Sequence, residues 1–301
     1  MDWKFQNIHS KDITKLKPFF SLRSNKTCDS VFLDTYLWKD TYKAEYMICN
    51  QEAVIWKVKH NGEYVSCVPL CTEDKLNHYF KLTEKYFHEV LNKKLVFNLV
   101  DEDSLRVLNL DPNKYAIEEL EDAADYVYDA ESLRTLKGKK YQKKRNHVNK
   151  FLKQYEGRHE YRTLDASHIQ LIWDFLQEWK ASHSRELEEH IETESRGIRS
   201  ILEHFTNLDA SMGGVFIDGR LRAFSIGSYN SREKMAIIHI EKADHNIDGL
   251  YPYINQQFLV HEYPDAILVN REDDMGLEGL RKAKRSYYPI KMARKFLILE
   301  K

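Results

Sequence analysis

Two side chains that can move protons lie two residues apart near the end of one predicted strand. In the segment His239-Ile240-Glu241-Lys242-Ala243-Asp244, the alternation of a strand places His239 and Glu241 on the same face. A carboxylate in this position could hold or deprotonate an incoming amine, and the histidine could tune it. The same two residues could instead form a hydrogen-bonded pair with a structural role.

A lysine is the second candidate for chemistry, because helical spacing directs it inward. Lys284 falls on the apolar face of a helix predicted over residues 277–285. An ammonium that faces inward requires a carboxylate, a dipole or a bound anion. Lys284 could therefore stabilise an anion at a site, or it could simply pair with Glu272 or Asp273.

Polar residues close to these two candidates supply a possible substrate-binding set. A polar loop that follows a strand and precedes a helix is a position that ligand sites favour in mixed sheets. The candidate substrate-binding residues are His239, Asp244, Asn255, Asn270, Arg271, Glu272 and Asp273. For Asn255, which lies in a helix predicted over residues 250–261, solvent exposure is an adequate alternative explanation.

Positive charge is concentrated between Arg134 and Lys153, where no acidic residue interrupts the sequence, although the formal net charge of the chain is -1. Helical spacing places Tyr141, Val148 and Phe151 on one apolar stripe, with basic residues on the adjacent face. Such a helix could bind the phosphates of a polyanion, or it could be a solvated surface. The candidate phosphate-binding residues are Lys139, Lys140, Lys143, Lys144, Arg145, His147 and Lys150.

The elements that must position these residues repeat one plan. In the first half, the pattern predicts a three-stranded meander over residues 44–49, 53–58 and 64–69, then a helix, a strand, a short helix and further extended segments. In the second half, helices over residues 166–182 and 186–207 precede a meander over residues 212–217, 221–229 and 235–242. A helix and a strand follow each meander. The sequence therefore predicts a duplicated α+β architecture.

An abrupt change of charge marks the predicted junction between the halves. Acidic residues from Glu118 to Glu131 contain no basic neighbour between them, and the basic segment follows directly. We predict one domain over residues 1–132 and a second over residues 133–301, which holds the basic helix and the candidate site. Glycine and proline are scarce, so the two halves are expected to pack together.

Composition excludes several classes of protein. Hydrophobic residues make up 42% of the 301 residues, which suffices for two cores, and no apolar run approaches the roughly 20 residues of a membrane-spanning helix. The N-terminus lacks the features of a secretory signal, so a cytoplasmic protein is expected. Four cysteines, without zinc-ligand spacing, predict buried thiols and no metal site. The sequence contains no glycine-rich phosphate loop and no Gly-x-Ser-x-Gly elbow.

The segment from Gly279 to Ile290, followed by Ala293-Arg294-Lys295-Phe296, resembles the C-terminal catalytic domain of phosphatidylglycerol lysyltransferases, as do the residues around Glu241 and Asn255. The resemblance implies two tandem GNAT-type acyltransferase folds, shared with the Fem-type aminoacyltransferases that use aminoacyl-tRNA. By position, Glu241 matches the family's acidic residue at the end of the central strand, and Lys284 matches its lysine before an aromatic-proline turn. The chain departs from the family at Asp244, where a basic residue is common.

The resemblance leads to a hypothesis about the reaction. The chain is expected to move an amino acid from aminoacyl-tRNA to an amine or hydroxyl of a lipid, peptide or small molecule, without a tightly bound cofactor. Glu241 would position or deprotonate the acceptor, and Lys284 would stabilise the oxyanion. The segment 245–250 contains one glycine, unlike the turn that binds coenzyme A in GNAT enzymes, so acetyl-coenzyme A is the less favoured donor. The alternatives are an RNA- or phosphate-binding module without catalysis and an acetyl-coenzyme A-dependent N-acetyltransferase.

Overall fold

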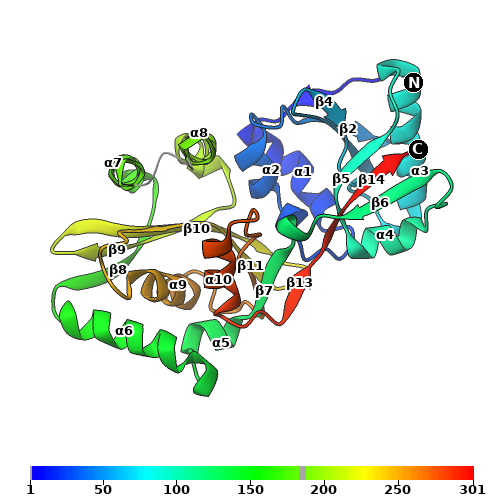
Figure 1. The fold of residues 1–301 in the computed structure, drawn as a ribbon. Coiled ribbons are helices and arrows are strands. Elements are labelled where there is room, and N and C mark those ends of the chain that lie inside the picture. The colour runs from blue at the N-terminus through cyan, green and yellow to red at the C-terminus, as the bar shows by residue number, and fades with distance from the viewer. Residues whose placement is uncertain (1, 183–187) are drawn as a thin grey trace.

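Three β-sheets with helices on both sides form the molecule (Figure 1). The computed structural model describes residues 2–182 and 188–301. The sheets contain four, seven and three strands. The mixed α+β class predicted from the sequence is confirmed. Across the described residues, no helix combines the length and the apolar character that crossing a membrane requires.

The first unit holds the four-stranded and three-stranded sheets. Their orders are β1-β2-β3-β4 and β5-β14-β6. The strands are β1 (Gln6–Asn7), β2 (Glu45–Cys49), β3 (Ala53–His60), β4 (Glu63–Val65), β5 (Val96–Asp101), β6 (Tyr115–Glu119) and β14 (Lys295–Glu300). The helices are α1 (Ile13–Phe20), α2 (Phe32–Trp38), α3 (Leu76–Tyr86) and α4 (Glu102–Leu108). Strands β2, β3 and β4 pair antiparallel, so the predicted meander of the first half is confirmed.

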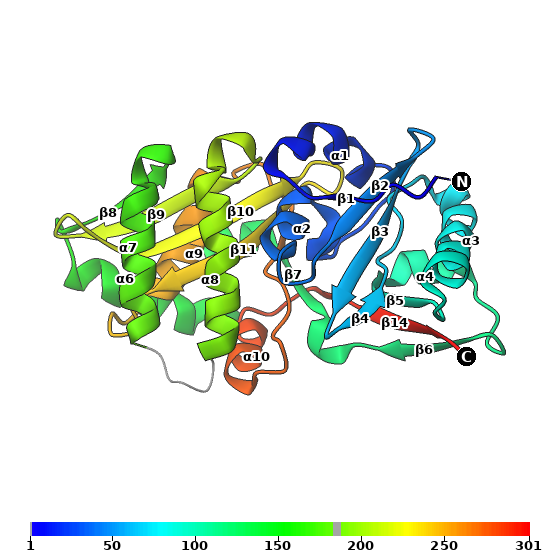
Figure 2. The same ribbon diagram turned by 90° about the horizontal axis from the view of Figure 1, so that it is seen from above.

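The second unit is built on the seven-stranded sheet, of order β13-β7-β12-β11-β10-β9-β8. Its strands are β7 (Asp125–Asp129), β8 (His159–Leu164), β9 (Ser211–Ile217), β10 (Arg220–Asn230), β11 (Met235–Ala243), β12 (Leu268–Asn270) and β13 (Lys291–Ala293). Its helices are α5 (Ala130–Thr135), α6 (Gln142–Gln154), α7 (Ile169–Ala181), α8 (Glu188–Glu203), α9 (Leu250–His261) and α10 (Glu278–Arg285). Helices α7 and α8 cover one face of the sheet, and α6 and α9 lie on the other (Figures 1 and 2). The part of the predicted helix 186–207 that precedes residue 188 lies outside the described residues.

Strand pairing joins the two halves of the chain in both directions. Strand β7, from the first half, pairs with β12 and β13 in the second sheet. Strand β14, from the end of the chain, inserts between β5 and β6 of the first unit. Figure 1 shows β13 and β14 running from one unit into the other. The boundary at residue 132 stays a prediction, and the seven-stranded and three-stranded sheets each contain one strand from the other side of it.

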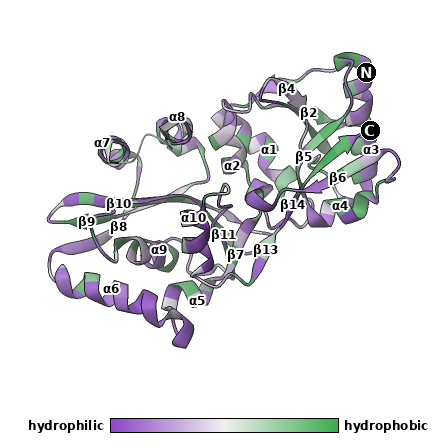
Figure 3. Ribbon diagram, viewed as in Figure 1, coloured by the Kyte–Doolittle hydropathy of each residue, from purple (hydrophilic) through white to green (hydrophobic). Residues whose placement is uncertain are grey.

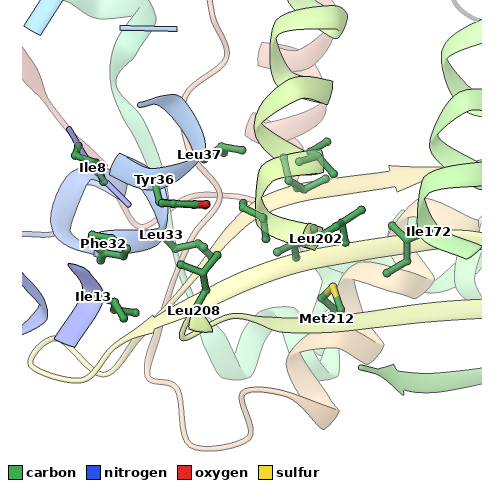
Figure 4. Close-up of a cluster of buried hydrophobic side chains, with 14 of the residues drawn as sticks. Ile8, Ile13, Phe32, Leu33, Tyr36, Leu37, Ile172, Leu202, Leu208 and Met212 are labelled. Atoms are coloured by element: carbon green, nitrogen blue, oxygen red, sulfur yellow. The ribbon is translucent and has the colours of Figure 1, made fainter. Parts of the chain in front are cut away.

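A shared hydrophobic core packs the units together. Side chains of α2, including Tyr36 and Leu37, lie in one buried cluster with Leu202 of α8 and Ile172 of α7 (Figure 4). A second cluster lies between the seven-stranded sheet and α9, and it includes Val148 and Phe151 of α6. The apolar stripe predicted for α6 is therefore confirmed, and its remaining surface is mostly hydrophilic (Figure 3).

Candidate active site

The two ends of the His239–Glu241 segment face opposite sides of the sheet. Ile226 of β10 pairs with Ile240, but Gly227 pairs with Ile238, so β11 contains an extra residue at His239. This is a β-bulge, which interrupts the alternation of a strand. Ile238 lies in the core under α9, whereas Ile240 lies in the core under α7 and α8. The prediction that His239 and Glu241 share a face is wrong, because the bulge between them reverses the pattern.

Glu241 is held on the α9 side of the sheet by two donors. The Nδ2 atom of Asn255 donates to one carboxylate oxygen at 2.9 Å, and Arg271 donates to the other at 2.9 Å. The side chains of Glu241 and Arg271 are 11% and 13% exposed. A charge-assisted hydrogen bond in such a position is stronger than one between neutral groups. Three of the predicted site residues, far apart in the sequence, are therefore in contact.

Aromatic side chains cover the guanidinium of Arg271. Its central carbon lies 4.8 Å from the ring centroid of Tyr287 and 6.0 Å from that of Tyr128. A planar guanidinium stacks favourably on aromatic faces. Neither tyrosine was predicted from the sequence to be a site residue. The position of Tyr287, just after α10 in the aromatic-proline turn, was the one available signal.

Lys144 of α6 reaches the same place. Its Nζ atom lies 3.9 Å from the ring centroid of Tyr287. Burial, together with the positive charges of Arg271 and Lys143, lowers the pKa of Lys144 to about 8, and Glu241 opposes this shift. Lys144 was predicted to bind phosphate on the surface, but it is half-buried beside the Glu241–Arg271 pair. Helix α6 therefore borders the candidate site.

Two buried polar atoms in this region have no hydrogen-bond partner among residues 2–182 and 188–301. They are the Nη1 atom of Arg271 and the Oγ atom of Ser225, and Ser225 pairs with Glu241 across β10 and β11. Most buried polar groups in proteins are hydrogen-bonded, so an unpaired one is a candidate for binding a ligand. Both are donors, and they suit an oxygen that carries a negative charge.

Lys284 fastens the loop that carries Arg271. Its Nζ atom donates to the backbone carbonyl oxygens of Arg271 and Asp273. Burial lowers the pKa of Lys284, and the negative charge of Glu272 opposes this shift. Tyr128 donates to the carbonyl oxygen of Lys284 at 2.9 Å. Glu241 and Lys284 are thus linked through Arg271, whose side chain binds the first and whose carbonyl oxygen binds the second.

The remaining predicted substrate-binding residues lie elsewhere. His239 contacts Glu272, with Nδ1 and Oε1 2.7 Å apart, on the side of the sheet that faces α2. Asn270 donates to Asp125 at 3.0 Å on the same side. Asp244, at the end of β11, lies 3.4 Å from Arg222. The predicted set is therefore divided between the two faces of the sheet.

The basic helix has both paired and exposed residues. Arg145 donates to the carbonyl oxygens of Leu136 and Gly138. His147 and Lys150 both contact Asp248, at 2.9 and 2.7 Å. Lys139, Lys140 and Lys143 are exposed to solvent. Lys150 is exposed as well, but its ammonium is paired with Asp248.

Helix α6 also covers the start of α9. Gly249, at the N-terminal end of α9, has a φ of +83°, and a Cβ atom there would lie 2.2 Å from the carbonyl oxygen of His147. Only glycine fits such a backbone at so close an approach. The N-terminus of a helix is a common anion-binding position, and here it packs against the chain itself.

An open cavity of about 610 Å³ lies between α2 and α8. Its lining includes Tyr36, Lys39, Ser200 and His204, and Tyr36 contacts both Ser200 and His204 at 3.1 Å. The residues that line it include none of the predicted site residues. Tyr36 is itself a buried member of the shared core.

Comparison with known proteins identifies the fold and the family. The model of the phosphatidylglycerol lysyltransferase C-terminal family matches residues 20–299. A solved structure of a conserved protein of unknown function from Bacteroides thetaiotaomicron is 28% identical, covers 99% of each chain and superposes with a TM-score of 0.91. A curated, uncharacterised protein of Mycoplasmoides gallisepticum is 28% identical over 188 residues. That match spans 62% of this chain and 59% of the relative.

Two further solved structures show the same fold at lower identity. L-PGS from Bacillus licheniformis is 15% identical with a TM-score of 0.68, over 96% of this chain and 92% of that one. FemX is 8% identical with a TM-score of 0.64, over 98% and 97%. The predicted resemblance and the predicted tandem GNAT-type fold are confirmed. Family and fold are those of an aminoacyltransferase-like domain.

Proposed function

Since the chain belongs to the phosphatidylglycerol lysyltransferase C-terminal family, we propose that it transfers an amino acid from aminoacyl-tRNA to an amine or hydroxyl of a lipid, peptide or small molecule. The observation that carries this proposal is the arrangement around Arg271. Its guanidinium is fixed by Glu241 and Tyr287, while its buried Nη1 atom has no partner within the described part of the chain. A fixed, unpaired donor is suited to an oxyanion that forms during acyl transfer.

The reaction assigns a task to each group. The acceptor nitrogen or oxygen attacks the ester carbonyl carbon of the donor, and Glu241 orients it and takes up its proton. Arg271 and the ammonium of Lys144 stabilise the oxyanion. The bond from the carbonyl carbon to the ribose oxygen then breaks, and that oxygen receives the proton. No covalent intermediate with the protein is required.

Lys284 acts in this scheme as a positioning residue. Its ammonium holds the carbonyl oxygens of Arg271 and Asp273 and so fixes the backbone from which the guanidinium extends. Small displacements of a catalytic group can reduce the rate by large factors. The loss of Lys284 should therefore lower turnover through Arg271.

Helix α6 supports the choice of an RNA donor. It carries the exposed Lys143 and, one residue later, Lys144 beside Arg271. Lysines on one helix can follow a phosphate backbone toward the site. The covered start of α9 disfavours acetyl-coenzyme A, whose pyrophosphate would need that helix end free.

A direct assay tests the proposal. The purified protein is incubated with pools of charged tRNA and with lipid or peptide extracts, and the loss of each aminoacyl ester is followed by mass spectrometry. We expect one ester to be consumed, and Glu241→Gln and Arg271→Met to reduce its loss while tRNA binding persists. Arg158→Met, which changes an exposed arginine, is the matched control.

Three results would contradict the proposal. If no ester is consumed while tRNA binds, the chain is a binding module. If Glu241→Gln and Arg271→Met consume the ester at the rate of the unmodified chain, the proposed site is wrong. If acetyl-coenzyme A protects the protein against thermal unfolding and aminoacyl-tRNA does not, the donor assignment is wrong.

A further inference from the structure

Three potential metal ligands meet where the two units join. They are Asp34 of α2, His239 at the bulge of β11, and Glu272 in the loop after β12. One ligand atom of each lies within 4.8 Å of the others. The nitrogen Nδ1 of His239 lies 2.7 Å from Oε1 of Glu272. A separation of up to 4.8 Å is about twice a usual metal–ligand distance of about 2.0–2.4 Å. The three atoms are therefore close enough to share one ion, which would replace the hydrogen bond between His239 and Glu272.

Asp34 is a buried carboxylate without a partner. Its exposed fraction is 6%, and it makes no hydrogen bond or ion pair with any described residue. Its carboxylate faces His239 and Glu272 across the cluster. An uncompensated buried carboxylate is costly, because a charge inside a protein requires a counter-charge or a coordinated cation.

The nearby lysines do not supply that counter-charge. The ammonium of Lys295 lies 3.0 Å from both Asp29 and Asp125. The ammonium of Lys284 donates to backbone carbonyl oxygens. Among the described residues, neither of these ammonium groups forms an ion pair with Asp34 or Glu272. The two carboxylates therefore share one imidazole and no ammonium.

The donor set is one that transition metals bind. Two carboxylate oxygens and one imidazole nitrogen form a three-residue set that leaves coordination positions open. The second nitrogen of His239 lies 2.8 Å from the hydroxyl of Ser228. Such an outer hydrogen bond orients the ring and fixes which nitrogen faces the ion.

We propose that Asp34, His239 and Glu272 bind one divalent transition-metal ion, Mn²⁺ or Zn²⁺. This inference goes beyond the proposed transfer reaction and does not depend on it. The ion joins α2 of the first unit to β11 and to the loop that carries Arg271. It therefore stabilises the junction between the units and fixes one end of the loop whose other contacts hold the candidate active site.

Two other groups of ligand-type residues are less suitable. Cys28 and Asp29 lie close to Asp34, but both already contact the ammonium of Lys295, at 3.2 and 3.0 Å. Glu84, His88 and Glu300 lie on a more open surface, where Lys114 pairs with both carboxylates. That second group serves as an internal control.

The test measures binding and stability without any assay of activity. The full chain is treated with a chelator, loaded with Mn²⁺ or Zn²⁺ and passed through a desalting column, and the retained metal is measured by mass spectrometry. We expect one ion per chain and a higher melting temperature for the loaded form. A free-ion concentration 100-fold above the dissociation constant shifts the unfolding equilibrium about 100-fold toward the folded state.

Variants assign the site. Asp34→Asn keeps the size of the side chain, and His239→Gln keeps its polarity; each should lose the retained ion and the melting shift. Glu84→Gln should keep both. If the unmodified chain retains no ion and its melting temperature is unchanged by either metal, or if Asp34→Asn retains the ion as well as the unmodified chain, the proposal is wrong. A Co²⁺-loaded sample adds an absorption spectrum that must disappear in the two site variants.

Discussion

The ion pair between Glu241 and Arg271 gives a quantitative prediction about stability. The joined atoms are 2.9 Å apart, and the two side chains are 11% and 13% exposed. Coulomb's law with an effective dielectric constant of about 20 gives an attraction of about 6 kcal/mol at this distance. Partial access to solvent reduces it, and we expect a coupling free energy of about 3 kcal/mol between the two residues.

The assay is a double-mutant cycle. Glu241→Gln leaves the guanidinium without its counter-charge, and Arg271→Met leaves the carboxylate with Asn255 as its remaining donor. Each single change should lower the free energy of unfolding by about 3 to 5 kcal/mol, because a mostly buried charge loses its partner. The double variant removes both charges, so its loss should be clearly smaller than the sum of the single losses. Urea unfolding is followed by tryptophan fluorescence and by circular dichroism, whose transitions must coincide.

A solvent-exposed ion pair on the surface is the control. Arg158 and Asp218 form an ion pair of similar geometry, but both side chains are more than half exposed. Their cycle should give a much smaller coupling, because solvent screens the pair. If the losses of Glu241→Gln and Arg271→Met add to within about 0.5 kcal/mol, the two side chains do not form the buried pair on which the proposed site depends.

Three further predictions concern α6 and its neighbours. Burial lowers the pKa of Lys144 from 10.5 to about 8 in the folded chain, so the unfolded chain binds more protons between these values and the free energy of unfolding should rise from about pH 8 to 10.5. Lys144→Met should remove this rise, which is measured by urea titrations at each pH. A rise that persists in the variant would contradict the lowered pKa. Exchange of Lys139, Lys140 and Lys143 for alanine should reduce the slope of log binding constant against log salt for tRNA by about 2 to 3, measured by fluorescence anisotropy, whereas the same exchange of the exposed Lys11, Lys81 and Lys94 should not. Gly249→Ala places a Cβ atom against His147 at a φ of +83° and should lower the free energy of unfolding by about 2 to 3 kcal/mol, whereas Gly219→Ala, where a Cβ atom would meet nothing within 4 Å, should be milder.

Periodicity predicted the elements because their patterns are local. The range predicted for α9, residues 250–261, agrees with the structure, and β9, β10 and β11 lie where alternation and turn residues placed them. The apolar stripe of α6 followed from the spacing of Val148 and Phe151. Such patterns are determined by which side of an element is buried. They contain no information about which distant element supplies the partner.

The site residues that were placed wrongly or missed all depend on contacts with distant parts of the chain. A bulge at His239 changes the face of Glu241, and nothing in an apolar strand sequence marks one extra residue. Asp34 was not predicted as a site residue, because His239 and Glu272, which it faces, are more than 200 residues away in the sequence. Tyr287 becomes a candidate only through the guanidinium of Arg271 that lies over its ring, and Ser225 only through its pairing with Glu241. Contacts of this kind depend on tertiary pairing.

The loop after β12 connects the two sites on opposite faces of the sheet. Arg271 directs its side chain to Glu241 on the α9 side, whereas Glu272, one residue later, contacts His239 on the α2 side. Lys284 holds the carbonyl oxygens on both sides of Glu272. A short, fastened backbone segment cannot shift one of these side chains without shifting the other. An ion bound by Glu272 would therefore restrict the guanidinium of Arg271, and an acyl group bound by Arg271 would in turn favour the arrangement that holds the ion.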